Sequence, residues 1–260
     1  MNAKTWRVFA WFCGFVAAGL CSTALSAQMS EVKEKPPMYS YIANWQIPRA
    51  HWGEMEKANA ADKVVLEKAM ADGTLVGYGN DAYAVHKMDG MTHDNWWSSM
   101  SMAGVLKVLE ALGASGSSAT PVLESSTKHE DLIMESRYYN WKPGSYKGAF
   151  VHVGSYMLKK DAPDNALEML SKQIVAPLLE KLIADGTLLE YEIDTAAIHS
   201  DAPGHFWIVY VTANPEGMDK VVASIMETVK QQPLQGVSFG AVTESKEHRD
   251  DLLRGEGTFK

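Results

Sequence analysis

Short apolar segments alternate with longer amphipathic segments along the chain, and this alternation predicts a mixture of strands and helices. Residues 39–47 and 149–158 are rich in aromatic and β-branched residues, which favours strands. In the segment 163–185, leucine and isoleucine recur every three to four residues and form the apolar stripe of an amphipathic helix. A corresponding helix is expected at 51–72. Each of the two helices ends in Ala-Asp-Gly, whose glycine is typical of a left-handed helix cap.

The same order of segments occurs twice. Residues 66–86 and 179–199 are identical at 12 of 21 positions, at a constant offset of 113. The similarity continues on both sides of these segments. Residues 37–135 and 149–260 are therefore predicted to be two copies of one unit, joined by a connector at 136–148.

The hydrophobic pattern of each copy predicts the order strand, helix, strand, strand, helix, strand. The two strands after the first helix are expected at 74–86 and 94–102 in the first copy, and at 187–199 and 205–213 in the second. The second helices are expected at 104–112 and 216–230, and the last strands near 121–125 and 237–243. This βαββαβ order is that of a ferredoxin-like unit, in which both helices cover one face of an antiparallel sheet. The predicted fold class is α+β, with the uncovered sheet faces apolar and packed against one another.

The duplicated order resembles the dimeric α/β-barrel superfamily, here with both ferredoxin-like units fused in one chain. The resemblance rests on element order and duplication, and it implies an intramolecular α/β barrel that holds a small, often aromatic, ligand between sheet and helices. The superfamily includes stress-responsive barrel proteins, cofactor-free monooxygenases, polyketide cyclases and haem proteins such as chlorite dismutases and dye-decolourising peroxidases. A ligand-binding protein, an enzyme and a stress-linked protein-interaction module therefore all stay open.

The resemblance also leaves haem open as a cofactor. Its haem-binding members commonly place the axial histidine in the middle of a helix, where this chain is expected to have none.

The first 27 residues differ from the rest. A basic start precedes an apolar run at 8–21, and small residues follow it. This is the pattern of a secretory signal peptide, cleaved between Ala27 and Gln28, and the run is too short for a membrane span. We expect an exported protein, periplasmic or secreted, without a stable membrane anchor and with a mobile polar lead-in at 28–36.

Composition narrows the classes of function. The only two cysteines, Cys13 and Cys21, lie in the predicted signal peptide, so the mature chain would have no disulfide, thiolate metal site or cysteine nucleophile. The formal net charge is −8, and removal of the signal peptide changes it to −10. An acidic chain is not expected to bind nucleic acid as its main partner. A small-molecule ligand is expected, and a homo-oligomer stays open.

Tyrosines and histidines at matching positions of the two copies are the candidate ligand-binding residues. Strand alternation places Tyr78 and His86 on one sheet face, and Tyr191 and His199 on another. His152 breaks the repeat and joins them. Such side chains in an aromatic-lined pocket would suit proton transfer on an aromatic or hydrophobic ligand, and the alternative is that they pack in the core.

Hairpin geometry indicates a candidate metal site. The two ends of each hairpin loop meet, which places His86 near His93 and His199 near His205, and the first helix begins near the first pair, at His51. Imidazoles with a nearby carboxylate suit a divalent metal, although no HxH or HExxH spacing is present. The alternative is that these are polar hairpin ends retained after duplication.

Two further polar groups have an open role. His129 and His248 follow the predicted last strands, so they are expected in turns at the opposite end of the barrel. Glu190, Glu192 and Asp194 alternate on one strand face, where they either flank a polar cavity or are solvated. The sequence does not decide between a binding protein and an enzyme.

Overall fold

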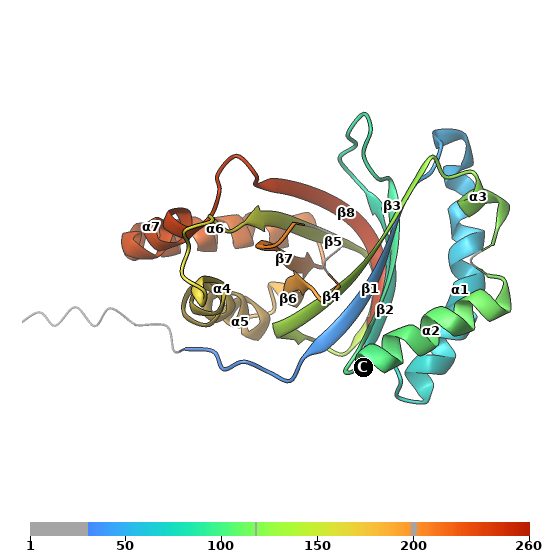
Figure 1. The fold of residues 1–260 in the computed structure, drawn as a ribbon, viewed down its shortest axis with the longest axis horizontal. Helices are drawn as coiled ribbons and strands as arrows, with labels where there is room; N and C mark the ends of the chain where they lie inside the picture. The colour runs from blue at the N-terminus through green and yellow to red at the C-terminus, as the bar shows by residue number, and fades with distance from the viewer. Residues whose placement is uncertain (1–30, 118, 199–201) are drawn as a thin grey trace, which may run out of the picture.

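A computed structural model describes residues 31–117, 119–198 and 202–260. In these residues, eight strands form one closed antiparallel barrel, and helices pack on the outside of it (Figure 1). The predicted signal peptide, its cleavage site and His199 lie outside the described residues. Every helix in the described ranges is too short or too polar to cross a membrane.

Each unit has the predicted βαββαβ order. The first unit contains β1 (Met38–Gln46), η1 (Arg49–Glu54), α1 (Met55–Ala71), β2 (Gly77–Tyr83), β3 (His93–Ser99), α2 (Met102–Ser115), α3 (Pro121–Glu124) and β4 (Lys128–Trp141). The second contains β5 (Gly144–Met157), α4 (Ala166–Leu170), η2 (Ser171–Val175), α5 (Ala176–Ala184), β6 (Leu188–Ala196), β7 (His205–Thr212), α6 (Pro215–Gln231), α7 (Pro233–Val242) and β8 (Arg249–Phe259). The α+β fold class is confirmed.

The two sheets join edge to edge rather than face to face. The strand order around the barrel is β1-β3-β2-β8-β5-β7-β6-β4. The last strand of each unit pairs both with the first strand of its own unit and with the second strand of the other unit, so β4 pairs with β6 and β8 pairs with β2. Closure in this way removes every free sheet edge among the described strands. It also turns one face of both sheets into a shared barrel interior.

The predicted last strands are wrong. Residues 121–124 and 233–242 form the helices α3 and α7, and each begins at a proline, which is well suited to the first helical turn. The true last strands, β4 and β8, begin several residues later with exposed polar residues, so the hydrophobic pattern missed them.

Because the last strands begin later than predicted, the two histidines after the predicted last strands also have a different position. His129 lies in β4 and His248 directly precedes β8. Both are at the end of the barrel that carries the β2–β3 loop. Lys128 Nζ, next to His129, donates to the Asp89 carbonyl of that loop at 2.8 Å, and Lys87 of the loop pairs with Asp251, three residues after His248. They are not at the opposite end.

The segment expected as a connector is mostly strand. β4 continues to Trp141 and β5 begins at Gly144, so only residues 142–143 join the two units, between long strands that are consecutive in sequence but do not pair with each other. The described part of the predicted lead-in lies along η2 of the second unit and β4 of the first. The Val32 N–H donates to the Lys172 carbonyl at 3.0 Å, and the Lys35 N–H donates to the Arg137 carbonyl at 2.9 Å.

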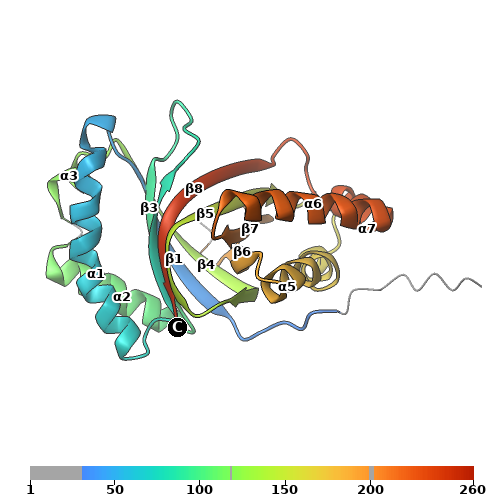
Figure 2. The same ribbon diagram turned by 180° about the vertical axis from the view of Figure 1, so that it is seen from behind.

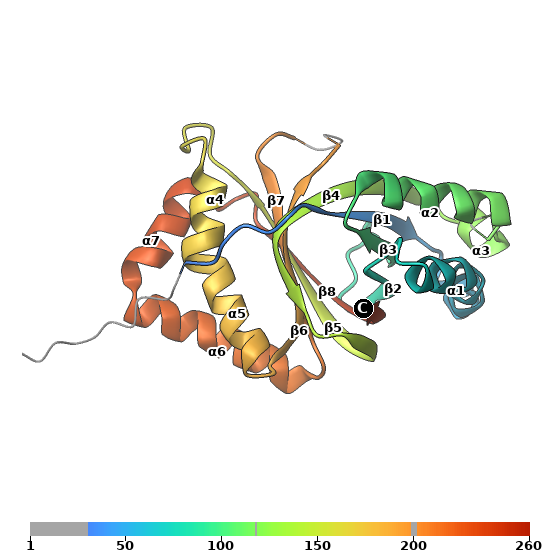
Figure 3. The same ribbon diagram turned by 90° about the horizontal axis from the view of Figure 1, so that it is seen from below.

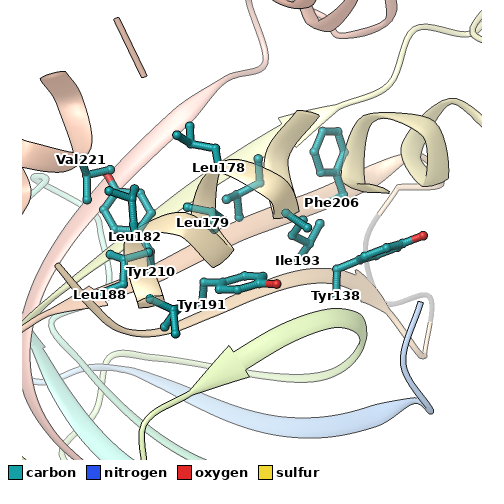
Figure 4. Close-up of a cluster of buried hydrophobic side chains, with 13 residues drawn as sticks. Tyr138, Leu178, Leu179, Leu182, Leu188, Tyr191, Ile193, Phe206, Tyr210 and Val221 are labelled. Atoms are coloured by element: carbon teal, nitrogen blue, oxygen red, sulfur yellow. The ribbon is translucent and has the colours of Figure 1, made fainter. Parts of the chain in front are cut away.

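The helices of the two units cover opposite sides of the barrel (Figures 2 and 3). A hydrophobic core lies under each set. In the first core, Tyr41 and Trp97 stack with ring centroids 4.4 Å apart. In the second, side chains from α5 and α6 pack on the outer faces of β6 and β7, with Leu182, Tyr191 and Val221 at most 2% exposed (Figure 4). These cores fill the spaces between sheet and helices.

Candidate functional site

The predicted ligand-binding residues point away from the barrel interior. Tyr78 and Tyr191 belong to the two separate hydrophobic cores, on the outer surface of the barrel. The Tyr191 hydroxyl donates to Glu180 Oε1 at 2.8 Å. Because the two tyrosines are repeat-related, the barrel itself separates them.

The described histidines of this group also lie on the outside. The exposed His86 ring packs on Trp52, with centroids 4.8 Å apart. His152 stacks on Tyr210 at 4.5 Å, and its Nε2 is 3.1 Å from Asp250 Oδ1. Burial lowers the pKa of His152 and outweighs the opposing attraction of Asp250. Tyr78, His86, His152 and Tyr191 therefore do not form one pocket.

The candidate metal residues contact protein groups instead. His86 and His93 both pack against the Trp52 indole, and burial together with the charge of His86 lowers the pKa of His93 to about 4. His51 Nδ1 is 3.1 Å from Glu54 Oε1. His205 lies in the other unit, against Trp207. Throughout the described ranges, no group of three or more His, Cys, Asp or Glu residues is arranged to hold a metal ion.

A cavity of about 350 Å³ occupies the barrel interior. Residues of all eight strands line it, and most of the wall is apolar. The apolar and aromatic lining residues include Ile42, Leu132, Met134, Val151, Val153, Trp96, Trp207, Val209, Val211 and Phe259. The volume falls in the range of small-molecule sites. The cavity is inside the barrel, not between sheet and helices where the superfamily resemblance implied a ligand.

The two ends of the cavity differ. At one end it is lined by the β2–β3 loop, with Lys87 and Met91, and by Asp251 at the start of β8. Lys87 Nζ is 2.5 Å from Asp251 Oδ1, and Lys87 is exposed, so this end is the mouth. Toward the other end Phe259 packs between Trp96 and Trp141, at centroid distances of 5.4 and 6.0 Å.

Five buried carboxyl groups face the cavity. They are Asp81 on β2, Asp94 on β3, and Glu190, Glu192 and Asp194 on β6, each at most 8% exposed. Asp81 and Asp94 are register partners on neighbouring strands, whereas β6 lies across the barrel from β2. The structure thus decides the open question of the alternating acidic face of β6: these side chains line a cavity and are not solvated.

The acidic wall is a departure from the repeat. At the offset of 113, Gly77, Gly79 and Asp81 of the first unit correspond to Glu190, Glu192 and Asp194 of the second. A Cβ atom on Gly79 would lie 2.5 Å from a ring atom of Trp96, so the glycine makes room for the indole. One unit therefore contributes an aromatic ring where the other contributes carboxyl groups. Sequence reasoning favoured residues that the two copies share, whereas the signal of this site in the sequence is a difference between the copies, glutamate in the second where the first has glycine.

The carboxyl groups share few hydrogen-bond donors. Trp96 Nε1 donates to Asp81 Oδ2 at 3.0 Å, and the Ser136 hydroxyl donates to Asp194 and, at 3.3 Å, to Glu192. Asp94 Oδ1 and Glu190 Oε1 have no hydrogen-bond partner.

Burial is the main cause of the altered acidity of these groups. It raises the pKa of Asp81 to about 6 and that of Asp194 to about 7. The pKa values of Asp94, Glu190 and Glu192 are raised further, because the negative charges of neighbouring carboxylates add to the effect of burial. The site therefore holds carboxyl groups that exchange protons near neutral pH.

No protein-family model matches the sequence, and no curated protein is similar to it. Several solved structures share its architecture. A proposed monooxygenase from Lactobacillus acidophilus NCFM superposes with a TM-score of 0.64 at 13% identity, over 85% of this chain and 94% of its own. A proposed monooxygenase from Fusobacterium nucleatum gives a TM-score of 0.60 at 10% identity, over 87% and 95%. An anthrone oxidase-like protein gives 0.53 at 10% identity, over 85% and 92%.

The chain has the dimeric α/β-barrel fold. The predicted resemblance is confirmed at the level of fold, with both ferredoxin-like units in one chain. At identities of 10–13% the similarity concerns the fold alone.

Haem does not fit the spaces between sheet and helices of this α/β barrel. None of the α-helices in the described ranges carries a histidine. In the second unit, the space between sheet and helices is filled by buried side chains such as Leu179, Leu182 and Phe206, each at most 3% exposed (Figure 4).

Proposed function

We propose that this protein binds a small organic molecule inside its α/β barrel. The observation that carries the proposal is the cavity of about 350 Å³, whose largely apolar wall includes five buried carboxyl groups. A few convergent polar groups in an apolar pocket are typical of ligand sites. The faces of Trp96, Trp207 and Phe259 favour a ligand with an aromatic or other hydrophobic body.

The acidic cluster supports a functional origin for the cavity. Burying carboxyl groups without partners costs free energy, and an apolar filling would stabilise the barrel better. The two outer cores of the same protein are filled in that way. Costly groups around an open volume are expected where a ligand completes the interior.

An uncharged probe tests whether the cavity binds a ligand, independently of the charges of the cavity wall. N-phenyl-1-naphthylamine, an aromatic dye that fluoresces in apolar surroundings, is expected to bind with a saturable 1:1 signal. Val209→Trp places an indole into the cavity at the position that matches Trp96, and should weaken dye binding at least tenfold. Met88→Trp is the matched control, because Met88 is 96% exposed. Equal binding by both variants, or no saturable binding by the wild type, would refute the proposal.

A cofactor-free enzyme is the second candidate. The observation that favours it is the raised pKa of Asp81 and Asp194, about 6 and about 7, which suits proton transfer near neutral pH. Two structures with this fold are proposed monooxygenases and a third is an anthrone oxidase-like protein.

Anthrone and molecular oxygen provide a direct assay of the enzyme candidate. A carboxylate would remove the proton from the ring CH₂ of anthrone, and oxygen would oxidise the resulting anion, with anthraquinone and water as products. We expect the protein to accelerate anthraquinone formation, and the double variant D81N/D194N to lose the acceleration. A rate that is equal with and without protein would exclude anthrone as a substrate.

We also propose that residues 1–27 direct export of the chain. The support is the basic start, the apolar run and the small residues before Gln28. Expression of the full chain in a bacterial host, with N-terminal sequencing of the exported fraction, tests this. The mature protein is expected to begin at Gln28.

A further inference from the structure

The ionisable groups that line the cavity are almost all acidic. Among the described lining residues there are seven carboxyl groups, one lysine and His205; the acidic ones are Asp81, Asp94, Glu130, Glu190, Glu192, Asp194 and Asp251. The lysine, Lys87, is at the mouth and pairs with Asp251. The deeper five form no ion pair with a described lysine or arginine. The interior therefore has many more acidic groups than basic ones, and few hydrogen-bond donors from other residues.

Two carboxyl oxygens in the cavity wall lack a hydrogen-bond donor. Asp94 Oδ1 and Glu190 Oε1 have no hydrogen-bond partner, and their side chains line the cavity from β3 and β6. The two residues are 7% and 3% exposed, so bulk water reaches them poorly. An unsatisfied buried polar group costs about 1–3 kcal/mol. A ligand that donates hydrogen bonds would remove this cost, whereas an acceptor or an anion would not.

A protonated amine matches this requirement. An ammonium group carries three N–H donors, has no acceptor and brings the positive charge that the cluster lacks. A divalent metal is a poorer match, because no described group of three or more ligating residues is arranged to hold one.

The rest of the cavity fits a hydrophobic body. Trp96 and Phe259 pack together at 5.4 Å on the side contributed by β3 and β8, and Trp207 lies on β7. Indole faces also attract cations. The cavity wall thus carries aromatic rings beside carboxyl groups, as in Trp207 on β7 next to Asp194 on β6, which suits a molecule with both an amine and an apolar body.

We infer that the ligand of this barrel is an organic cation, a primary amine with an aromatic or aliphatic body. Its ammonium group lies among Asp81, Asp94 and the β6 carboxylates, and its body lies against Trp96, Trp207 and Phe259. The inference rests on the proposed function, since it names the class of molecule that the cavity binds.

Three probes with one skeleton test the charge preference. Isothermal titration calorimetry at pH 7.5 would compare 4-phenylbutylamine, 4-phenylbutanol and 4-phenylbutyrate on the wild-type mature chain. We expect the amine to bind at least tenfold more tightly than the alcohol, and the carboxylate to bind most weakly. Equal or tighter binding of the alcohol or carboxylate would overturn the inference, and so would tight binding of Zn²⁺ or Mg²⁺ in place of the amine.

Two variants with side chains of nearly the same shape test whether the buried carboxyl groups bind the amine. Glu190→Gln and Asp94→Asn should each reduce amine affinity at least fivefold and leave alcohol affinity within twofold. Glu110→Gln, on the exposed face of α2, is the matched control and should change neither. If amine affinity is unchanged in both cavity variants, the inference is overturned. If either variant fails to fold, the three-probe comparison on the wild type still decides.

The neutral dye separates this inference from the proposed function. If Val209→Trp abolishes dye binding but the protein shows no preference for the amine, the cavity is a ligand site and the inference that its ligand is a cation is wrong. Failure of the dye and of all three phenylbutyl probes to bind would overturn both.

Discussion

Replacing Asp194 with asparagine should make the protein more resistant to unfolding at alkaline pH. Asp194 is 2% exposed, accepts a hydrogen bond from the Ser136 hydroxyl and interacts with the neighbouring Glu192 carboxyl. An asparagine side chain has nearly the same shape. Its carbonyl oxygen can accept from Ser136 and its NH₂ group can donate to Glu192, so it imitates the protonated acid.

The size of the effect follows from the pKa of Asp194. Burial raises this pKa from 3.8 to about 7, so between these values the folded chain retains a proton that the unfolded chain has released. Stability of the wild type therefore falls as pH rises through this window. One pKa unit corresponds to about 1.4 kcal/mol, so the loss reaches about 4 kcal/mol above pH 7. Asparagine does not titrate, and the variant escapes this loss.

Urea unfolding followed by circular dichroism, at one-unit intervals from pH 4 to pH 8, measures the difference. The unfolding free energy of Asp194→Asn minus that of the wild type should grow from pH 4 to pH 7 and then level off. Asp164→Asn, an exposed position before α4, controls for the chemical change itself. A difference that stays flat, or that shrinks with rising pH, would refute a buried Asp194 that prefers its proton.

Four further predictions address the packing and the processing of the chain. Gly79→Ala should lower the free energy of unfolding by about 1–3 kcal/mol, because its Cβ would lie 2.4 Å from the Glu256 carbonyl oxygen and 2.5 Å from a ring atom of Trp96. Gly113→Ala, where a Cβ meets nothing within 4 Å, should instead stabilise α2 slightly in the same thermal unfolding assay. Tyr191→Phe should cost about 1 kcal/mol through the lost bond to Glu180, and should leave dye and amine affinities unchanged because the ring is outside the barrel. Altered ligand affinity in this variant would contradict that placement. Mass spectrometry of the exported protein should give the mass of a chain that starts at Gln28, and an intact N-terminus would contradict the signal peptide.

Local patterns sufficed for much of the fold. The duplication, the amphipathic helix before Gly186 and the β-branched first strands depend on residues close in sequence, so the βαββαβ order followed from them. The last strands did not follow, because the first residues of β4 and β8 are exposed and polar, and sheet pairing holds them in strand conformation. The apolar segment 237–243 was instead predicted to be a strand, and residues 237–242 lie in α7.

The candidate site was only partly predictable, for a reason of geometry. Alternation shows which residues share a strand face, and it correctly grouped Glu190, Glu192 and Asp194 on one face of β6 and Tyr191 on the other. It does not show which face becomes the inside of a barrel. A core-forming tyrosine and a cavity-forming acid are adjacent in sequence and point in opposite directions.

The sequence by itself determined two copies of a ferredoxin-like unit and the residues that share each strand face. Only the tertiary structure decided that the polar face of β6 is the inner one. Pairing of β4 with β6 and of β8 with β2 closes the sheets into one barrel, and the helices then cover the outer faces. Burial of Glu190 and its neighbours comes from this long-range closure. The same closure raises their pKa values and encloses the carboxyl groups of β6 and the Trp96 ring of the other unit in one cavity.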